Sequence, residues 1–196
     1  PMIPTFTIDV LLYEVVNDNA IIFPRSGALL LAHPLMEDPN FARTVVLLIA
    51  HDDSEGSMGV VLNRPDVDAD IDADSPLQRW IHSAAAPYQP FIGGPVEIAN
   101  FICLQEDITA TSGVTSIDIM SDSPRHGFRH RVFRGYSGWG PRQLLREINM
   151  GGWIVVASEQ NDVFDNDSTT LWSRVLARQT SDVRKLAQFP DDPSLN

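Results

Sequence analysis

The sequence contains very little cysteine, and it has no long apolar run. Its single cysteine, Cys103, cannot form a disulfide within the chain. Because Cys103 lies in the apolar segment FICL, we expect a buried strand position rather than a reactive thiolate. Asp9 and Glu14 interrupt the apolar residues near the N-terminus, and no basic segment precedes them, which argues against a signal peptide and a membrane span. We therefore expect a cytoplasmic protein that does not contact a membrane.

Basic residues are also scarce. The chain has 14 Lys and Arg against 26 Asp and Glu, its formal net charge is −12, and Lys185 is its one lysine. This excess of negative charge disfavours long-range attraction to nucleic-acid phosphates. A length of 196 residues, of which 43% are hydrophobic, suits one globular domain. We expect a single domain over 1–196, with an N-terminal helix and lead-in at 1–26 and a frayed tail at 189–196.

Motifs of known catalytic and cofactor-binding sites are absent from the sequence. It has no P-loop, dinucleotide fingerprint or nucleophile elbow. The aspartates of DVDADIDAD, from Asp66 to Asp74, lack the glycine and glutamate of a calcium-binding EF-hand loop, so a solvated loop or edge is expected. His126 and His130 lie in an extended segment without the glutamate of a zinc-binding helix. We predict no catalytic residue, no metal and no cofactor.

The sequence is rich in short apolar runs that glycine and proline separate. Runs of strand length follow one another too closely for alternating βαβ units, which predicts an α+β domain with a meander of antiparallel strands. Apolar residues at a spacing near 3.6 predict helices. Strands are predicted at 28–32, 44–50, 56–65, 130–136 and 153–158, with two around a tight turn in 91–105 and one in 108–120, and helices at 7–20, 76–86, 141–150 and 169–179.

The segment from Gly135 to Gly151 is predicted to form a glycine-rich turn that leads into a short capped helix. Pro141 suits the first turn of this helix, and Gly151 suits a left-handed stop. Free amides at the helix start, among arginines, are expected to attract an anion. Alternatively, the glycines permit tight packing around Tyr136 and Trp139, and the arginines pair with aspartates elsewhere. The arginines of this segment and its approach are Arg125, Arg129, Arg131, Arg134, Arg142 and Arg146.

Three segments in the same order resemble the YqgE/AlgH family of bacterial proteins. They are GALLLAHPLMEDPNFARTVVLLIAHDDSEGSMGVVLNRP, FIGGPVE and GYSGWGPRQLLREINMGGWIVV. The resemblance implies a compact α+β fold, in which helices flank a curved, mixed and largely antiparallel sheet, and a bacterial, cytoplasmic protein. It implies no particular reaction. One family member's name is associated with transcriptional regulation of alginate production, but no helix-turn-helix is visible in this sequence.

The candidate binding residues come from these matching segments and from the arginines. We expect them to bind a small anion or a protein partner, which makes a noncatalytic regulatory or interaction protein the preferred function. A second hypothesis is a hydrolase or transferase acting on a phosphorylated small molecule, with Arg64 or Arg131 holding phosphate and His130 as the acid or base. A transcriptional regulator contacting nucleic acid is the third and least favoured. The candidates are Asn63, Arg64, Gly93, Gly94, Arg131, Gly135, Tyr136, Gly138, Trp139 and Gln143.

Overall fold

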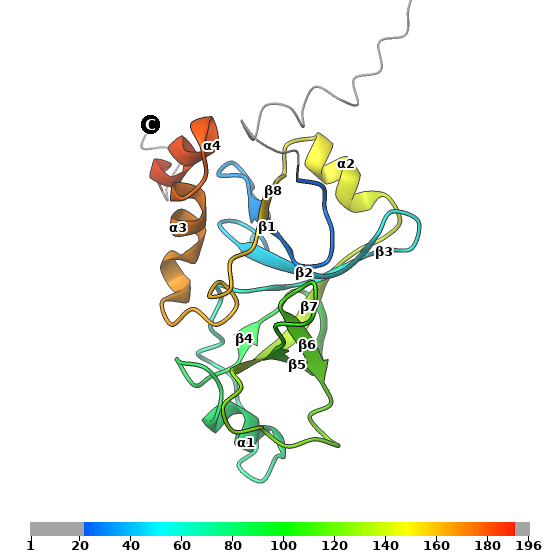
Figure 1. Ribbon diagram of the computed structural model, residues 1–196, viewed down its shortest axis with the longest axis vertical. Helices are drawn as coiled ribbons and strands as arrows, with labels where there is room; N and C mark the ends of the chain where they lie inside the picture. The colour runs from blue at the N-terminus through cyan, green and yellow to red at the C-terminus, as the bar shows by residue number, and fades with distance from the viewer. Residues whose placement is uncertain (1–21, 191–196) are drawn as a thin grey trace, which may run out of the picture.

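The computed structural model describes residues 22–190, and its strands form one twisted, eight-stranded sheet (Figure 1). The predicted N-terminal helix and most of the predicted frayed tail lie outside these residues. The strand order is β6-β5-β7-β3-β2-β1-β8, and β4 pairs with β7 beside this path. The strands are β1 (Ala28–Ala32), β2 (Val45–Asp52), β3 (Gly56–Val61), β4 (Phe91–Ile92), β5 (Val96–Glu106), β6 (Val114–Ile117), β7 (His130–Trp139) and β8 (Trp153–Ala157).

The central strands β1, β2 and β3 form the meander that their apolar runs predict. β2 pairs antiparallel with both neighbours. Leu29 and Leu47 belong to the hydrophobic core on one face of the sheet, and Leu30 and Val46 belong to the core on the other face. All four side chains are buried. Because both faces are covered, these strands read as continuous apolar runs rather than as alternating patterns.

β7 joins the two halves of the sheet. Its first part pairs with β5, and its last part, Ser137 to Trp139, pairs with β3. Every other pairing between named strands is antiparallel except the short parallel pairing of β4 with β7, which makes the sheet mixed. The predicted α+β fold with a mixed, largely antiparallel sheet is therefore confirmed.

The predicted glycine-rich turn at Gly135 was wrong, because Gly135 to Trp139 continue β7 and the chain leaves the sheet only at Gly140. A Cβ atom on Gly93 would lie 2.3 Å from the carbonyl oxygen of Gly135. A Cβ atom on Gly135, where φ is +66°, would lie 2.6 Å from the carbonyl oxygen of Gly94. Glycine is thus needed here for close backbone contact and a left-handed conformation inside the sheet.

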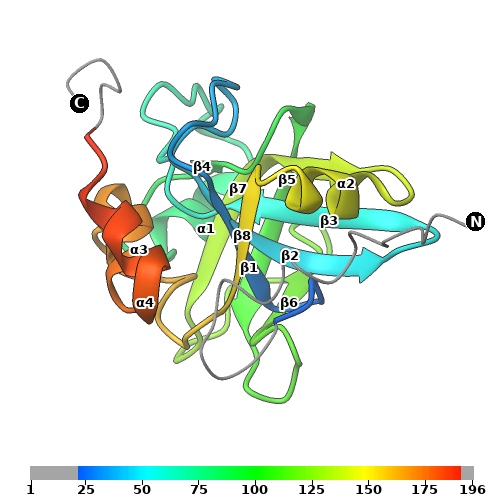
Figure 2. The same ribbon diagram turned by 90° about the horizontal axis from the view of Figure 1, so that it is seen from above.

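Helices cover both faces of the sheet and one end of it (Figures 1 and 2). Trp172 of α3 packs in the same core as Leu31 of β1, whereas Leu144 of α2 packs with Leu30 on the opposite face. Trp80 of α1 belongs to a third core cluster, with residues of β5 and β7. The helices are α1 (Leu77–His82), α2 (Gln143–Asn149), α3 (Leu171–Ala177) and α4 (Ser181–Lys185), with 3-10 turns η1 (Ser168–Thr170) and η2 (Leu186–Gln188).

The helices that were predicted within the described residues are present but shorter than predicted. The apolar stripe of α3 docks onto the sheet as expected, while α4 and η2 were not predicted. Gly151 follows α2 with a φ of +80°, in agreement with its predicted role as a left-handed stop. Between residues 22 and 190, no helix has the length and apolar character needed to cross a membrane.

Candidate functional site

The structure places the predicted site residues in three different environments. Arg64 and Gly94 line a small surface groove. Trp139 and Gln143 belong to a hydrogen-bonded network beneath α2. Arg131 lies in the interior, where its side chain contacts the segment between β8 and η1. The candidates therefore do not converge on one site.

The groove has a volume of about 110 Å³ and lies where the loop before β2, the segment after β3 and the β4–β5 turn meet. A liquid water occupies about 30 Å³, so the groove has room for a few waters or one small chemical group. Among the described residues that line it, there is no carboxylate, histidine, thiol or hydroxyl. The lining residues are Asn40, Val61, Arg64, Ile92, Gly94, Pro95 and Ile98.

Arg64 supplies the positive charge of the groove. Its guanidinium donates hydrogen bonds to the carbonyl oxygens of Asn40, at 2.7 Å, and Ala42, at 3.0 Å. Partial burial lowers the pKa of the Arg64 guanidinium, and the nearby Asp38 carboxylate opposes this change. Since arginine stays protonated in proteins, the groove contains a cation that two backbone carbonyls hold in place.

Asn63 braces the loop that Arg64 contacts. Its side-chain nitrogen donates to the carbonyl oxygen of Arg43 at 2.8 Å, and its side-chain oxygen accepts from the amide of Val45 at 2.9 Å. This pair of bonds joins the end of β3 to the start of β2. Asn63 therefore positions the groove and does not line it.

Behind the groove, the backbone of the β4–β5 turn packs directly against β7. The residues in contact are Gly93, Gly94, Gly135 and Tyr136. A Cβ atom on Gly94 would lie 2.3 Å from the carbonyl carbon and oxygen of Tyr136. The carbonyl oxygen of Gly93 accepts the hydroxyl of Ser137 at 3.0 Å. These contacts fix the direction in which the β4–β5 turn leaves the sheet. The glycines thus shape the groove because they allow the backbone of the β4–β5 turn to pack closely against β7.

Trp139 and Gln143 are tied to the carboxylate of Glu147. The indole nitrogens of Trp139 and Trp153 donate to one oxygen of Glu147, at 2.9 Å and 2.8 Å. The Gln143 amide nitrogen donates to the other oxygen at 2.9 Å, and the Gln143 amide oxygen accepts the backbone amide of Gly140 at 3.0 Å. Trp139 is only 5% exposed. This network binds α2 to the sheet.

Amides at the start of α2 that the anion hypothesis would use already have partners. The amide of Arg142 donates to the carbonyl oxygen of Asp53 at 3.0 Å, and the amide of Gln143 donates to the carbonyl oxygen of Gly140 at 3.0 Å. Gly138 is exposed, but it lies within β7 and pairs with Met58 of β3. An anion site is therefore better supported at Arg64 than at this helix.

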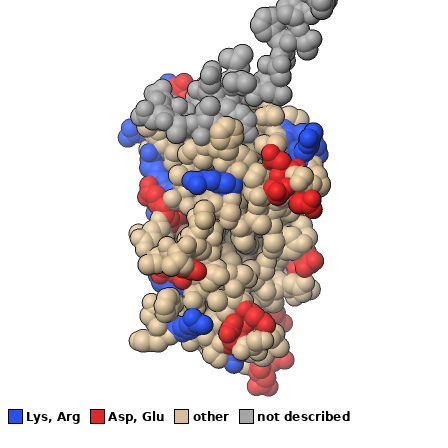
Figure 3. All heavy atoms as spheres, turned by 45° about the vertical axis from the view of Figure 1, so that its right-hand side comes forward, with Lys and Arg blue, Asp and Glu red and all other residues tan. Residues whose placement is uncertain are grey.

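The arginines that precede α2 do not form one positive surface. Arg129 pairs with Glu106 through two hydrogen bonds, at 2.6 Å and 3.1 Å, and Arg134 pairs at 2.5 Å with Asp66, which is 5% exposed. Each carboxylate raises the pKa of its arginine. The first aspartate of the acidic run is thus buried, unlike the solvated loop predicted for it. On the face shown in Figure 3, basic side chains lie apart from one another among acidic ones.

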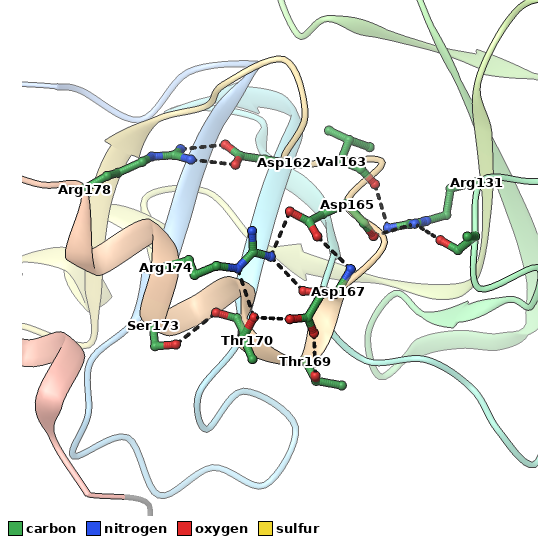
Figure 4. Close-up of polar contacts among 11 residues, drawn as sticks. Arg131, Asp162, Val163, Asp165, Asp167, Thr169, Thr170, Ser173, Arg174 and Arg178 are labelled. Carbon is green, nitrogen blue, oxygen red and sulfur yellow. Dashed lines mark hydrogen bonds and ion pairs between the residues drawn. The ribbon is translucent and has the colours of Figure 1, made fainter.

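Arg131 is fully buried and bound by the main chain (Figure 4). Its guanidinium donates to the carbonyl oxygens of Val163 at 2.9 Å, Ala86 at 2.6 Å and Asp165 at 2.9 Å. Its Cζ atom lies 4.2 Å from the centroid of the Phe91 ring. Burial lowers the pKa of Arg131 to about 10. With 0% exposure and three carbonyl partners, Arg131 is placed to join segments of the fold rather than to hold a phosphate.

His130 and Cys103 are also interior residues. The Nε2 atom of His130 lies 2.8 Å from the carbonyl oxygen of Trp80, and the residue is 1% exposed, which leaves it no contact with a substrate. Cys103 is buried in β5 as predicted, and burial raises the pKa of its thiol to about 12. In the range 22–190, no three His, Cys, Asp or Glu side chains are grouped so that they could hold a metal ion.

A cluster of Ser57, His51 and Asp53 at the β2–β3 hairpin was not predicted from the sequence. The Nδ1 atom of His51 lies 2.7 Å from the Ser57 hydroxyl, and its Nε2 atom lies 3.2 Å from the Asp53 carboxylate. These are the residue types of a nucleophile, a base and an orienting acid. Strand register brings Ser57 opposite His51, and no sequence motif signals that register.

The fold is that of a small α+β protein with a shallow, arginine-containing groove, and comparison with known proteins identifies its family. The AlgH-like family matches residues 29–184, and the chain belongs to this family. A UPF0301 protein of Streptomyces coelicolor is 40% identical over 188 residues, which cover 87% of this chain and 95% of the relative. A UPF0301 protein of Thermobifida fusca is 38% identical over 191 residues, with coverage of 87% and 95%.

Solved structures share the fold. The crystal structure of a protein from Corynebacterium diphtheriae matches with a TM-score of 0.74 at 25% identity, and the match covers 91% of this chain and 97% of that chain. The solution structure of the AlgH protein from Pseudomonas aeruginosa matches with a TM-score of 0.59 at 24% identity, with coverage of 83% and 93%. The predicted resemblance to the YqgE/AlgH family is confirmed, and these relatives are bacterial.

Proposed function

We propose that this protein acts in the bacterial cytoplasm as a noncatalytic interaction protein that binds a carboxylate in the Arg64 groove. The observation that carries the proposal is the lining of the groove, in which one guanidinium and one amide lie among apolar side chains. A positioned nucleophile, acid or base is what catalysis requires, and the described lining residues provide none. Recognition of a bound group is the function that this lining supports.

The size and chemistry of the groove indicate the kind of group that it binds. Pockets for whole metabolites usually measure about 300–1,000 Å³, so this groove suits one end of a molecule. Arg64 has donor groups left over after its two carbonyl contacts, and arginine binds carboxylates well. Ile92, Pro95 and Ile98 provide apolar contact beside it. The expected ligand is a carboxylate next to a short aliphatic group, either on a free acid or on a protein partner.

A regulatory role follows from partner binding in this proposal, without direct contact with DNA. Arg129 and Arg134 are already paired with carboxylates, and the net charge of −12 repels a polyanion. Regulation would then depend on what occupies the groove.

Titration with isovalerate, monitored by the backbone amide signals of labelled protein, tests the proposal. We expect saturable shifts confined to 40–42, 61–64 and 92–98, and binding at least about 10-fold weaker in Arg64→Gln, because a charged hydrogen bond contributes roughly 1.5–3 kcal/mol. Arg146→Gln removes the same charge from an exposed position on α2 and should bind normally. Equal binding by both variants would disprove the role of Arg64.

A second probe distinguishes the two sources of the carboxylate. The blocked peptide acetyl-Glu-Val-amide presents a side-chain carboxylate next to an aliphatic residue. Tighter binding of this peptide than of isovalerate indicates a protein partner, whereas the reverse order indicates a free acid. If neither probe binds at millimolar concentrations, the groove is not a carboxylate site.

A hydrolase is the second candidate, and the contacts of Ser57 favour it. His51 can take the Ser57 proton while the serine oxygen attacks an acyl or phosphoryl centre and displaces the leaving group, which accepts that proton from His51. Water, deprotonated by His51, can then hydrolyse the covalent intermediate, which releases the acid or phosphate and restores Ser57. The side chain of His51 is 11% exposed, and that of Asp53 is 59% exposed. Turnover of p-nitrophenyl acetate or phosphate that disappears in Ser57→Ala would establish this activity. Equal turnover in both proteins would exclude Ser57 as the nucleophile.

A further inference from the structure

A second cavity, separate from the Arg64 groove, lies between the β5–β6 loop and the segment that follows β8. Its volume is about 370 Å³, which is within the usual range for ligand pockets of about 300–1,000 Å³. Polar side chains form its walls, and Val114, Val163 and Phe164 provide apolar surface. The lining residues are Glu106, Ile108, Ala110, Thr111, Ser112, Gly113, Val114, Ser158, Glu159, Gln160, Val163 and Phe164.

We propose that this cavity binds a small organic cation, namely an alkyl amine or guanidine. Among the described residues that line it, two are glutamates and none is Lys, Arg or His. The proposal uses residues outside the Arg64 groove, so it goes beyond the proposed function and does not depend on it.

The charges next to the cavity leave it with an excess of negative charge. Glu106 is neutralised by Arg129, whose guanidinium contacts it at 2.6 Å. Arg178 is committed to Asp162 through two hydrogen bonds, at 2.7 Å and 2.6 Å, and its contact with Glu159 is longer, at 3.3 Å. Three carboxylates therefore share two guanidiniums. The Glu159 side chain, which is 68% exposed, retains acceptor capacity for an incoming cation.

Both walls of the cavity are held in place before any ligand binds. On one side, the Asp162 carboxylate that Arg178 holds also accepts the backbone amide of Glu159 at 2.7 Å. On the other, the Asp107 carboxylate accepts the hydroxyl and the amide of Thr109, at 2.6 Å and 2.9 Å. A preorganised site loses less conformational entropy when a ligand binds. The cavity is therefore suited to a small ligand that cannot order loops itself.

The mixture of polar and apolar lining defines the ligand class more closely. Glu159 and the hydroxyls of Thr111 and Ser158 can accept the hydrogen bonds of an ammonium or guanidinium group, while Val163 and Phe164 can contact an alkyl chain. Binding of an anion is disfavoured, because two glutamates line the cavity and the protein has a net charge of −12. Agmatine combines an amine, a guanidine and a four-carbon chain, which makes it a suitable probe.

Calorimetric titration of agmatine into the full chain tests the proposal. We expect one saturable site, with Kd at least about 10-fold higher in Glu159→Gln than in the parent protein, since a charge-assisted hydrogen bond is lost. Glu159 is exposed, so this change should leave the stability almost unaltered. Glu55→Gln, at an exposed position in the β2–β3 turn, removes the same charge and should bind agmatine normally.

Other outcomes would overturn the assignment. Equal weakening in Glu159→Gln and Glu55→Gln would mean that agmatine responds only to the net charge. Unchanged affinity in Glu159→Gln, or no saturable binding at millimolar agmatine, would remove the site. Amide signals of labelled protein provide a second readout, and shifts outside 106–114 and 158–164 would contradict the location. Arg64→Gln should leave agmatine binding intact, which separates this test from that of the Arg64 groove.

Discussion

Arg64 and Arg131 have the same side chain and the same type of partner, yet they occupy opposite kinds of environment. Both guanidiniums donate to backbone carbonyls, two for Arg64 and three for Arg131. Arg64 does so at the wall of a groove, whereas Arg131 has 0% exposure. The remaining donors of Arg64 are those that the proposed ligand would use. The charge of Arg131 is committed to holding three chain segments together.

The largest effect should come from Arg131→Met. This change leaves the carbonyl oxygens of Ala86, Val163 and Asp165 without their donor in the interior, so we expect a loss of about 3 kcal/mol in the free energy of unfolding. Urea denaturation measures it. Arg131→Lys keeps the charge but cannot reach all three carbonyls, and its loss should be intermediate. Wild-type stability in Arg131→Met would show that the buried guanidinium is not a structural tie.

For Glu147→Ala we expect a smaller loss in the free energy of unfolding, of about 2 kcal/mol. It removes the acceptor of the Trp139 and Trp153 indoles and of the Gln143 amide, and unpaired buried donors cost roughly 1–3 kcal/mol. Urea denaturation gives the loss, and tryptophan fluorescence shows whether α2 stays docked. Glu147→Gln preserves one acceptor and serves as the milder control. If Glu147→Ala leaves the free energy of unfolding unchanged, the hydrogen bonds of the Glu147 carboxylate do not hold α2 on the sheet.

Arg64→Gln should change stability by less than about 1 kcal/mol. The carbonyl oxygens of Asn40 and Ala42 lie near the surface, where water can replace the lost donor. The same urea experiment as for Arg131 makes the comparison direct. A loss as large as that of Arg131→Met would make Arg64 another structural tie and would weaken its role in binding.

The smallest effect concerns Glu106 and Arg129, whose side chains are 19% and 37% exposed. The hydrogen bond from Arg129 lowers the pKa of the Glu106 carboxyl. A carboxyl whose pKa is lower in the folded state stabilises the fold above its unfolded pKa of about 4.3, and this contribution is lost as pH falls through the folded pKa. Glu106→Gln should therefore lower the free energy of unfolding by less than about 1 kcal/mol at pH 7, and by a smaller amount at pH 3. An equal difference at both pH values would contradict the pairing.

Residue patterns along the chain were sufficient to predict much of the fold. Continuous apolar runs such as ALLLA mark strands because both faces of the central sheet are covered. The stripe on α3 predicts its docking, since helical spacing places those side chains on one face. α4 escaped prediction because its five residues are too few to show a period. The turn assigned to Gly135 was wrong because glycine also permits close backbone contact, which no local pattern distinguishes from a turn.

What the sequence by itself determined is most of the strands and helices, the α+β class, the family and the stock of charged side chains. Only the tertiary structure decided which arginine meets solvent, which meets a carboxylate and which is buried. Strand register places Arg131 opposite Leu104 and Arg134 opposite Phe101, so neighbouring arginines of one strand have unrelated surroundings. The physical reason is that burial and partners depend on contacts between segments far apart in the chain, such as β7 with the loop before α3.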